Sequence, residues 1–198
     1  MAVNVNRIKI AESRSKILNA ASELFLQGGV AALSVRAIAK RAGLSTIGIY
    51  SHFQGKQGIL DALYIEGFEL VFDAMNVKPK GKIRREDVLQ GARGYLRVGR
   101  EHEAHYRLIF GESDRGYKPS EEAIAASQRA FGKLLSLAGG FLPAASGLPE
   151  RQQLALDVWA IVHGYVSISH HAIAGQGWDL DDMALQAVAT HLDAAPSD

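Results

Sequence analysis

Residues Ser34–Leu60 read SVRAIAKRAGLSTIGIYSHFQGKQGIL, and this stretch decides how the chain folds. Ser34 is a residue type that caps helix starts, because its hydroxyl accepts a hydrogen bond from a backbone amide of the first turn. Gly43 can adopt the positive φ of a tight turn. Ser45 then offers a second cap. The pattern therefore predicts two short helices on either side of Gly43, which together make a helix-turn-helix unit.

Helical periodicity extends over most of the remaining sequence, and no segment alternates as a strand does. Apolar spacings predict a first helix that begins near Glu12 and stops at Gly28, and a fourth from Lys56 to before Pro79. Further helices are predicted at about 84–101, 103–111, 119–139, 150–174 and 180–193. The fold class is therefore all-α, with a three-helix head that contains the helix-turn-helix and a larger helical domain.

The chain divides at a polar stretch, Lys78–Lys82, that contains helix breakers. We predict a head over residues 1–56, a connecting helix over about 56–76 and a second domain over 77–198. The head holds eight Lys or Arg against two Glu, a net charge of +6, whereas residues 57–198 carry −5. A basic head on an acidic body favours a polyanion as the partner of the head.

The helix that begins at Thr46 has the features of one that enters the DNA major groove. Its first residues are small or polar, so its backbone can approach the base edges, and Gly48 allows a close approach. Ile49 and Phe53 are four residues apart and can anchor the inner face. Thr46, Ile47, Tyr50 and Ser51 then lie on more outward arcs.

The end of this helix carries side chains suited to the DNA backbone. Tyr50 and His52 can donate to phosphate oxygens and fix the register of the protein on the duplex. Lys56 opens the next helix, where its ammonium and the positive helix end attract the same phosphate.

The stretch Ser34–Leu60 resembles the DNA-binding signature of the TetR family of repressors in its cap, its Gly turn, its Tyr-x-His-Phe close and its Lys at the next helix start. The resemblance covers about residues 10–65. It implies a cytoplasmic, ligand-responsive homodimer, most often a repressor, that binds a pseudo-palindromic double-stranded operator and is released by a small-molecule effector. It also implies that the DNA contacts come from Ser34, Arg36, Thr46, Ile47, Gly48, Tyr50, His52 and Lys56.

The second domain carries a further resemblance. Arg93–Arg97, Tyr106–Phe110 and Trp159–Gly164 resemble a TetR-type C-terminal domain that is named for its Trp, His and Gly. His163 could bind a ligand, or it could be a satisfied core histidine beside a core tryptophan. Effector sites are usually apolar cavities. We predict that the lining is drawn from aromatic and neighbouring side chains, some of which are core instead: Phe68, Phe72, Met75, Tyr95, Tyr106, Phe110, Phe131, Trp159 and His163.

The last two helices are more apolar than a surface helix needs. We predict that they pair with their counterparts in a second subunit as a four-helix interface. The apolar residues on which this rests are Leu154, Val158, Ile161, Val162, Tyr165, Ile168, Ile173, Leu185, Val188 and Leu192.

Composition narrows the remaining alternatives. The chain has no cysteine, which excludes disulfides and thiolate metal sites and fits a reducing cytoplasm. The N-terminus lacks the apolar core of a signal peptide, and no run is long enough to span a membrane, so we expect no membrane partner.

An enzyme is one alternative, because His102 and His105 are three residues apart and could share a helix face. A metal site needs a converging third ligand, and the sequence contains no HExxH, phosphate-binding glycine loop or GxSxG. We therefore predict no catalytic residue, no metal and no cofactor. A helical interaction module without specific DNA binding is the other alternative, and an activator within the same family also stays open.

Overall fold

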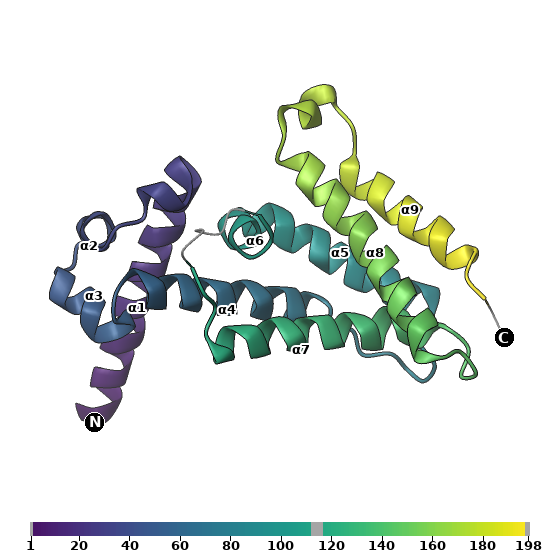
Figure 1. The fold of residues 1–198 in the computed structure, drawn as a ribbon, viewed down its shortest axis with the longest axis horizontal. Coiled ribbons are helices and arrows are strands. Elements are labelled where there is room, and N and C mark those ends of the chain that lie inside the picture. The colour runs from purple at the N-terminus through teal and green to yellow at the C-terminus, as the bar shows by residue number, and fades with distance from the viewer. Residues whose placement is uncertain (1, 112–116, 197–198) are drawn as a thin grey trace. The chain divides into compact units, whose positions relative to one another are not determined.

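The chain is helical in the computed structural model, which describes residues 2–111 and 117–196 (Figure 1). No strand occurs in these ranges, and no helix there combines the length and apolar character that crossing a bilayer needs. The all-α prediction is confirmed. The elements are α1 (Ala2–Gly28), η1 (Gly29–Ala32), α2 (Val35–Ala42), α3 (Thr46–Phe53), α4 (Lys56–Ala74), α5 (Arg85–Glu101), α6 (Glu103–Phe110), α7 (Glu121–Ala138), η2 (Gly139–Phe141), α8 (Leu148–Ser169), η3 (Ala172–Gln176) and α9 (Leu180–Asp193).

The first helix begins at Ala2, so the predicted start near Glu12 is wrong. No Gly or Pro precedes Glu12, and nothing in the sequence there breaks a helix. The apolar stripe used for the prediction marks only where packing begins: Ile17 is fully buried, whereas Ile8 is 52% and Ile10 44% exposed.

The predicted helix 150–174 is also too long at its C-terminal end. α8 ends at Ser169, because the backbone of His171 is extended (φ −104°, ψ 157°) and cannot continue the helix. The short 3-10 helix η3 follows instead.

The described residues pack into two compact units. Unit 1 contains those within Met1–Gly67 and Glu103–Ala125, and unit 2 those within Phe68–His102 and Ala126–Asp198. Helices α4 and α7 each contribute residues to both units. The functional division at residues 56 and 77 stays a prediction.

One apolar cluster holds unit 1 together. Its members from the first four helices include Ile17, Ile38, Ile49 and Ile59, all fully buried. Each side chain of this size that is removed from water contributes about 1.5–3 kcal/mol. Ala104 and Leu108 of α6 belong to the same cluster, so a segment far along the chain completes this core.

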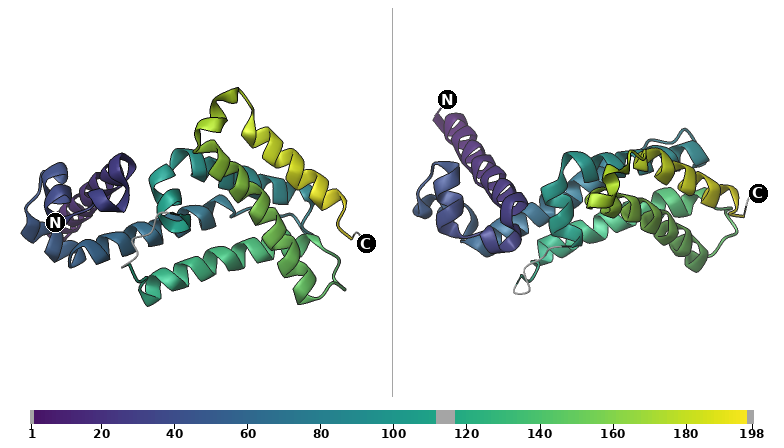
Figure 2. Two further views of the ribbon diagram at one scale, coloured as in Figure 1. Left: turned by 45° about the horizontal axis from the view of Figure 1, so that its top comes forward. Right: turned by 90° about the horizontal axis from the view of Figure 1, so that it is seen from above.

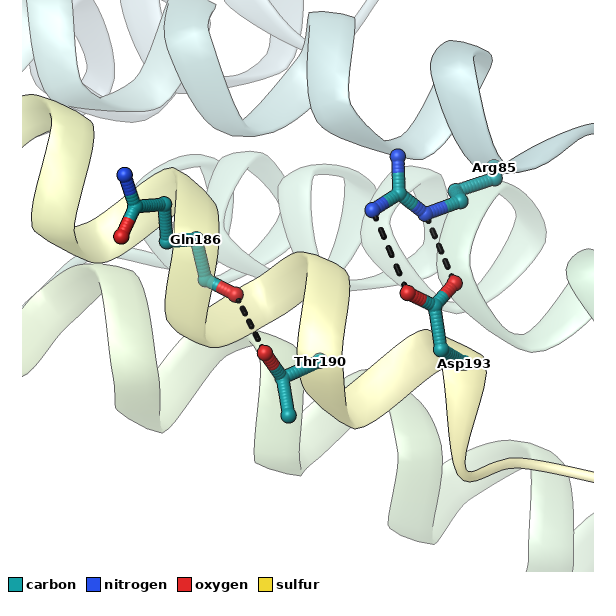
Figure 3. A network of polar contacts seen from close by, with 4 residues as sticks. All are labelled: Arg85, Gln186, Thr190 and Asp193. Atoms are coloured by element: carbon teal, nitrogen blue, oxygen red, sulfur yellow. Dashed lines mark hydrogen bonds and ion pairs between the residues drawn. The ribbon is translucent and has the colours of Figure 1, made fainter.

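Unit 2 is built on α5, α8 and α9, which contact one another; α8 and α9 lie side by side in both views of Figure 2. Arg85 at the start of α5 donates to Asp193 at the end of α9, from Nε to Oδ1 at 2.8 Å and from Nη2 to Oδ2 at 3.3 Å (Figure 3). Both side chains are about half exposed, so the pair contributes less than about 1 kcal/mol. The buried side chains of the three helices, among them Leu96, Val158 and Val188, account for most of the packing.

The turn between α3 and α4 leaves no room for a side chain at Gly58. A Cβ there would lie 1.9 Å from the carbonyl oxygen of Phe53. We expect Gly58→Ala to lower the free energy of unfolding by about 1–3 kcal/mol, measured by urea unfolding. The control is Gly132→Ala in α7, where a Cβ meets nothing within 4 Å and helix propensity favours alanine by up to about 1 kcal/mol. Equal effects of the two substitutions would contradict this packing.

Candidate nucleic-acid interface and polar cluster

The helix-turn-helix has the caps and the turn that its sequence predicts. The Ser34 hydroxyl accepts from the amide of Ala37 at 3.1 Å, and the Ser45 hydroxyl accepts from the amide of Gly48 at 3.1 Å. Gly43 ends α2 with a φ of 67°, in the left-handed region that favours glycine. These local bonds fix where α3 begins and how it leaves the turn.

Helix α3 buries one face and exposes the other. Ile49 is fully buried and Phe53 is 5% exposed, so both anchor the helix on the core of unit 1. On the opposite arc Ile47 is 79% and Tyr50 56% exposed, and Thr46 is exposed as well. Ile47 and Tyr50 therefore leave apolar and aromatic surface exposed beside the polar Thr46. The outward arc is the one predicted to face DNA.

Gly48 and Arg36, two more of the predicted DNA contacts, also keep exposed surface. A Cβ at Gly48 would meet only the Ser45 hydroxyl oxygen, at 3.6 Å. Because Gly48 has no side chain, another molecule can approach the backbone of α3 closely at this point. Arg36 lies on α2 with an exposed side chain. Ser34 is exposed too, and its hydroxyl oxygen already accepts the capping bond.

His52 and Lys56 are less exposed than the sequence suggests. Both are partly buried, and the Lys56 ammonium lies 3.4 Å from the carbonyl oxygen of Val30. An ammonium has three donor hydrogens, so it can bind more than one acceptor.

Arg14 is a residue of this region that the sequence reasoning missed. Its Nη1 donates to the carbonyl oxygen of His52 at 2.9 Å, and its guanidinium carbon lies 4.3 Å from the centre of the Phe53 ring. This contact joins α1 to the C-terminal end of α3. The two segments are 38 residues apart, and no local pattern signals such a pairing.

Residues outside the predicted head also form hydrogen bonds that stabilise unit 1. The Tyr117 hydroxyl donates to Asp61 Oδ1 at 2.7 Å, and the amide of Ser120 donates to the same oxygen at 3.1 Å. Burial, followed by the bond to Asp61, raises the pKa of Tyr117 well above its ordinary value. Gln57 Nε2 donates to the carbonyl oxygen of Lys118 at 2.7 Å. The segment 117–120 is thereby fastened to the first half of α4.

Three of the predicted effector-site residues meet in a polar cluster in unit 2. Trp159 Nε1 donates to the Tyr95 hydroxyl at 2.9 Å, and His163 Nδ1 lies 3.4 Å from the same oxygen. Tyr95 is buried, whereas Trp159 and His163 are partly buried. Burial lowers the pKa of His163, which favours its neutral form. The cluster brings together a hydroxyl, an indole and an imidazole from α5 and α8.

The other predicted effector-site residues are distributed over both units. In unit 2, Phe68 and Met75 are buried, Phe131 is 38% exposed, and the Phe72 ring lies 5.7 Å from the Lys133 ammonium. In unit 1, the rings of Tyr106 and Phe110 are 5.0 Å apart and pack edge to face.

One small gap in unit 1 involves none of the predicted effector-site residues. It has no room for a water molecule, and its lining consists of Ser22, Phe25, Leu63, Ala104, His105 and Leu108. It is too small to be an effector cavity. The effector site therefore stays a prediction.

The two histidines considered as metal ligands, His102 and His105, belong to unit 2 and unit 1 respectively. His105 Nε2 lies 3.2 Å from a carboxylate oxygen of Glu66, and both side chains belong to unit 1. Within residues 2–111 and 117–196, no group of three His, Asp or Glu side chains is placed to hold a metal ion.

A capped helix-turn-helix followed by a larger helical domain is the architecture of a helix-turn-helix transcriptional regulator. Residues 17–63 match the family described as "Bacterial regulatory proteins, tetR family", and residues 88–191 match "Tetracyclin repressor-like, C-terminal domain". The second match alone covers more than half of the chain, which belongs to the TetR family of transcriptional regulators.

Individual relatives agree with this assignment. The chain is 23% identical to the uncharacterized HTH-type transcriptional regulator Rv0681 of Mycobacterium tuberculosis over 91% of this chain and 78% of that one. It is 35% identical to the HTH-type transcriptional regulator UidR of Escherichia coli K12 over 29% of each chain. The fold is similar to that of a TetR-family regulatory protein from Rhodococcus RHA1, with a TM-score of 0.72, 19% identity, and coverage of 94% of this chain and 98% of that one.

Lowering the pH is expected to destabilise unit 2 through His163. Because burial lowers the pKa of this group in the folded state, the unfolded chain binds more protons. The stability that neutral His163 contributes to the folded state is fully present above about pH 6.5, the ordinary pKa of histidine in an unfolded chain. This stability is lost as the pH falls below that value. Urea unfolding at about pH 7.5 and about pH 5.5 measures the loss, and His163→Gln, which does not titrate, should lose less. The same loss in both proteins would assign the acid sensitivity to other groups.

Proposed function

We propose that this TetR-family regulator is a repressor that binds a pseudo-palindromic operator as a homodimer and is released by a small-molecule effector. The observation that carries the proposal is the outward arc of α3, where Ile47 is 79% and Tyr50 56% exposed beside the buried anchors of the same helix. Binding of operator DNA is the function that this arc supports best. The protein would act in the bacterial cytoplasm, where the DNA is, and its function would require no catalytic residue, metal or cofactor.

Each DNA-binding residue has a distinct role in this proposal. Thr46, Ile47 and Gly48 face the bases, and the methyl groups of Ile47 suit contact with thymine. Tyr50, His52 and Lys56 hold phosphates and set the register, as does the exposed cap residue Ser34. Arg36 reaches a base edge or a phosphate from α2. Because Ile47 and Gly48 offer few hydrogen bonds, direct readout depends on Arg36, Thr46 and methyl contacts.

Binding of DNA can be tested on the upstream region of the protein's own gene across a salt series. Each phosphate contact lowers the slope of log affinity against log salt by about 0.9. We expect Tyr50→Ala/Lys56→Ala to bind more weakly than the wild type, with a slope shallower by about one unit per head. Lys80→Ala, which removes an exposed charge from unit 2, is the matched control and should bind as the wild type does. Equal binding by all three proteins would refute the proposed interface.

The exposed face of α8 supports a homodimer. Leu156 and Ile168 are 40% and 39% exposed, and Ala160 and Gly164 lie between them at four-residue intervals, which places all four on one face. A Cβ at Gly164 would meet nothing within 4 Å, so a second helix can approach closely there. Met183 of α9 adds a side chain that is 42% exposed.

The dimer surface differs in part from the one that the sequence predicts. Ile161, Tyr165, Ile168 and Leu185 keep exposed surface, whereas the side chain of Ile173 lies outside the described residues. The remaining residues of that prediction are buried within the chain and belong to its own core: Leu154, Val158, Val162, Val188 and Leu192.

A charge on the exposed face of α8 is expected to dissociate the dimer. Leu156→Glu/Ile168→Glu would place carboxylates between two apolar helices, where an unpaired charge is strongly unfavourable. Light scattering at micromolar concentration should give twice the chain mass of 21.4 kDa for the wild type and the single mass for the variant. Leu26→Glu, at a 44% exposed position of α1, is the control and should stay dimeric. A monomeric wild type would overturn the dimer.

The helix α4 is the proposed route from effector to DNA. It runs without a break from Lys56 in unit 1 to Ala74 in unit 2, and it carries Phe72 of the predicted effector site. An effector that binds one orientation of this helix more tightly than another shifts the equilibrium between the two orientations by the difference in binding free energy.

A reporter gene under the protein's own upstream region distinguishes a repressor from an activator. Deletion of the regulator raises expression of the reporter if the protein is a repressor and lowers it if the protein is an activator.

A further inference from the structure

The first turns of α1 form an exposed arm at the edge of unit 1. We define this arm as residues 7–12, all of which are exposed. Figure 1 and the right view of Figure 2 show the N-terminal part of α1 extending past α3 and past the start of α4, which belong to the same unit. Ile8 and Ile10 keep 52% and 44% of their surface exposed, so the arm does not pack on the core of its own unit.

The contact of Arg14 fixes where the arm starts. Its guanidinium donates to the His52 carbonyl oxygen at 2.9 Å and covers the Phe53 ring at 4.3 Å, so α1 passes the C-terminal end of α3 at this residue. Seven residues make nearly two helical turns, so Arg7 lies on the same face as Arg14 and about 10 Å further along α1. Ile10 lies between them on that face. The arm therefore continues outward from the end of α3 that carries Tyr50 and His52.

The charge of the arm suits a polyanion. Arg7 and Lys9 are exposed, Glu12 is its one acidic residue, and among the described residues neither base has an ion-pair partner within 4.0 Å. DNA presents one phosphate charge about every 1.7 Å along its axis. A duplex that lies against the outward arc of α3 brings phosphates to the same end of the helix.

We propose that this arm is a further DNA-binding element, in which Arg7 holds a phosphate that flanks the bases read by α3. The proposal rests on the proposed function, since it requires α3 in the major groove. Ile10, next to Arg7 on the same face, covers the apolar edge of a sugar. Lys9 lies about 160° around the helix from Arg7 and does not share this contact.

The test compares two substitutions that change the charge equally and differ only in helix face. Binding of the full chain to a random-sequence duplex of about 40 bp is measured across a salt series, because phosphate contacts do not depend on sequence. Arg7→Gln is expected to make the slope shallower by about 0.9 per head and to weaken binding about two- to fivefold at moderate salt. Lys9→Gln should keep the wild-type slope, and Arg7→Lys should restore most of the loss because it keeps the charge.

Each outcome assigns the result to one proposal. An unchanged slope in Arg7→Gln, or equal losses in Arg7→Gln and Lys9→Gln, would overturn the arm contact while the α3 interface stands. A wild type that binds neither this duplex nor the upstream region would overturn the proposed function itself. Gln is a good helix former, so circular dichroism should show the same helix content for wild type and variants.

Discussion

The burial of Ile49 and Phe53 is the constraint on which the DNA-binding surface depends. A helix of eight residues has little else to fix its rotation, and these two side chains, four residues apart, fill the core of unit 1. Once they are buried, the period of the helix leaves only one arc for the remaining side chains. The exposure of Ile47 and Tyr50 therefore follows from the same packing, and the cap at Ser45 determines only where α3 starts.

Local patterns predicted most of the fold because the signals are local. A serine cap, a glycine turn and an apolar stripe involve residues within a few positions of one another, and the bounds of α2, α3, α5, α6 and α9 follow from them closely. The start of α1 was missed because the apolar stripe reports packing, not helix formation. The end of α8 was missed because the extended backbone at His171 has no marker in the residues themselves.

Contacts between distant segments could not be predicted in the same way. Nothing near Arg14 indicates that it binds the end of α3, and nothing near Tyr117 indicates a bond to Asp61. The meeting of Tyr95 with Trp159 and His163 joins segments more than 60 residues apart, although the spacing of Trp159 and His163 on one face of α8 was visible in the sequence. The packing of α6 side chains in the core of unit 1 could not be predicted for the same reason, because their partners are distant in sequence and only the fold brings them together.

The shared core of unit 1 bears on how such a regulator could be recombined. Asp61 is partly buried and holds two donors from residues 117–120, and Ala104 and Leu108 lie beside side chains of α1 and α4 in the apolar cluster. A helix-turn-helix head that is cut from the chain at the end of α4 would expose an apolar surface and would leave the Asp61 carboxylate without its two hydrogen-bond donors. Exchange of the head between regulators as a cassette therefore has to carry α6 and the start of α7 with it, or replace them with segments that have been selected on the same surface.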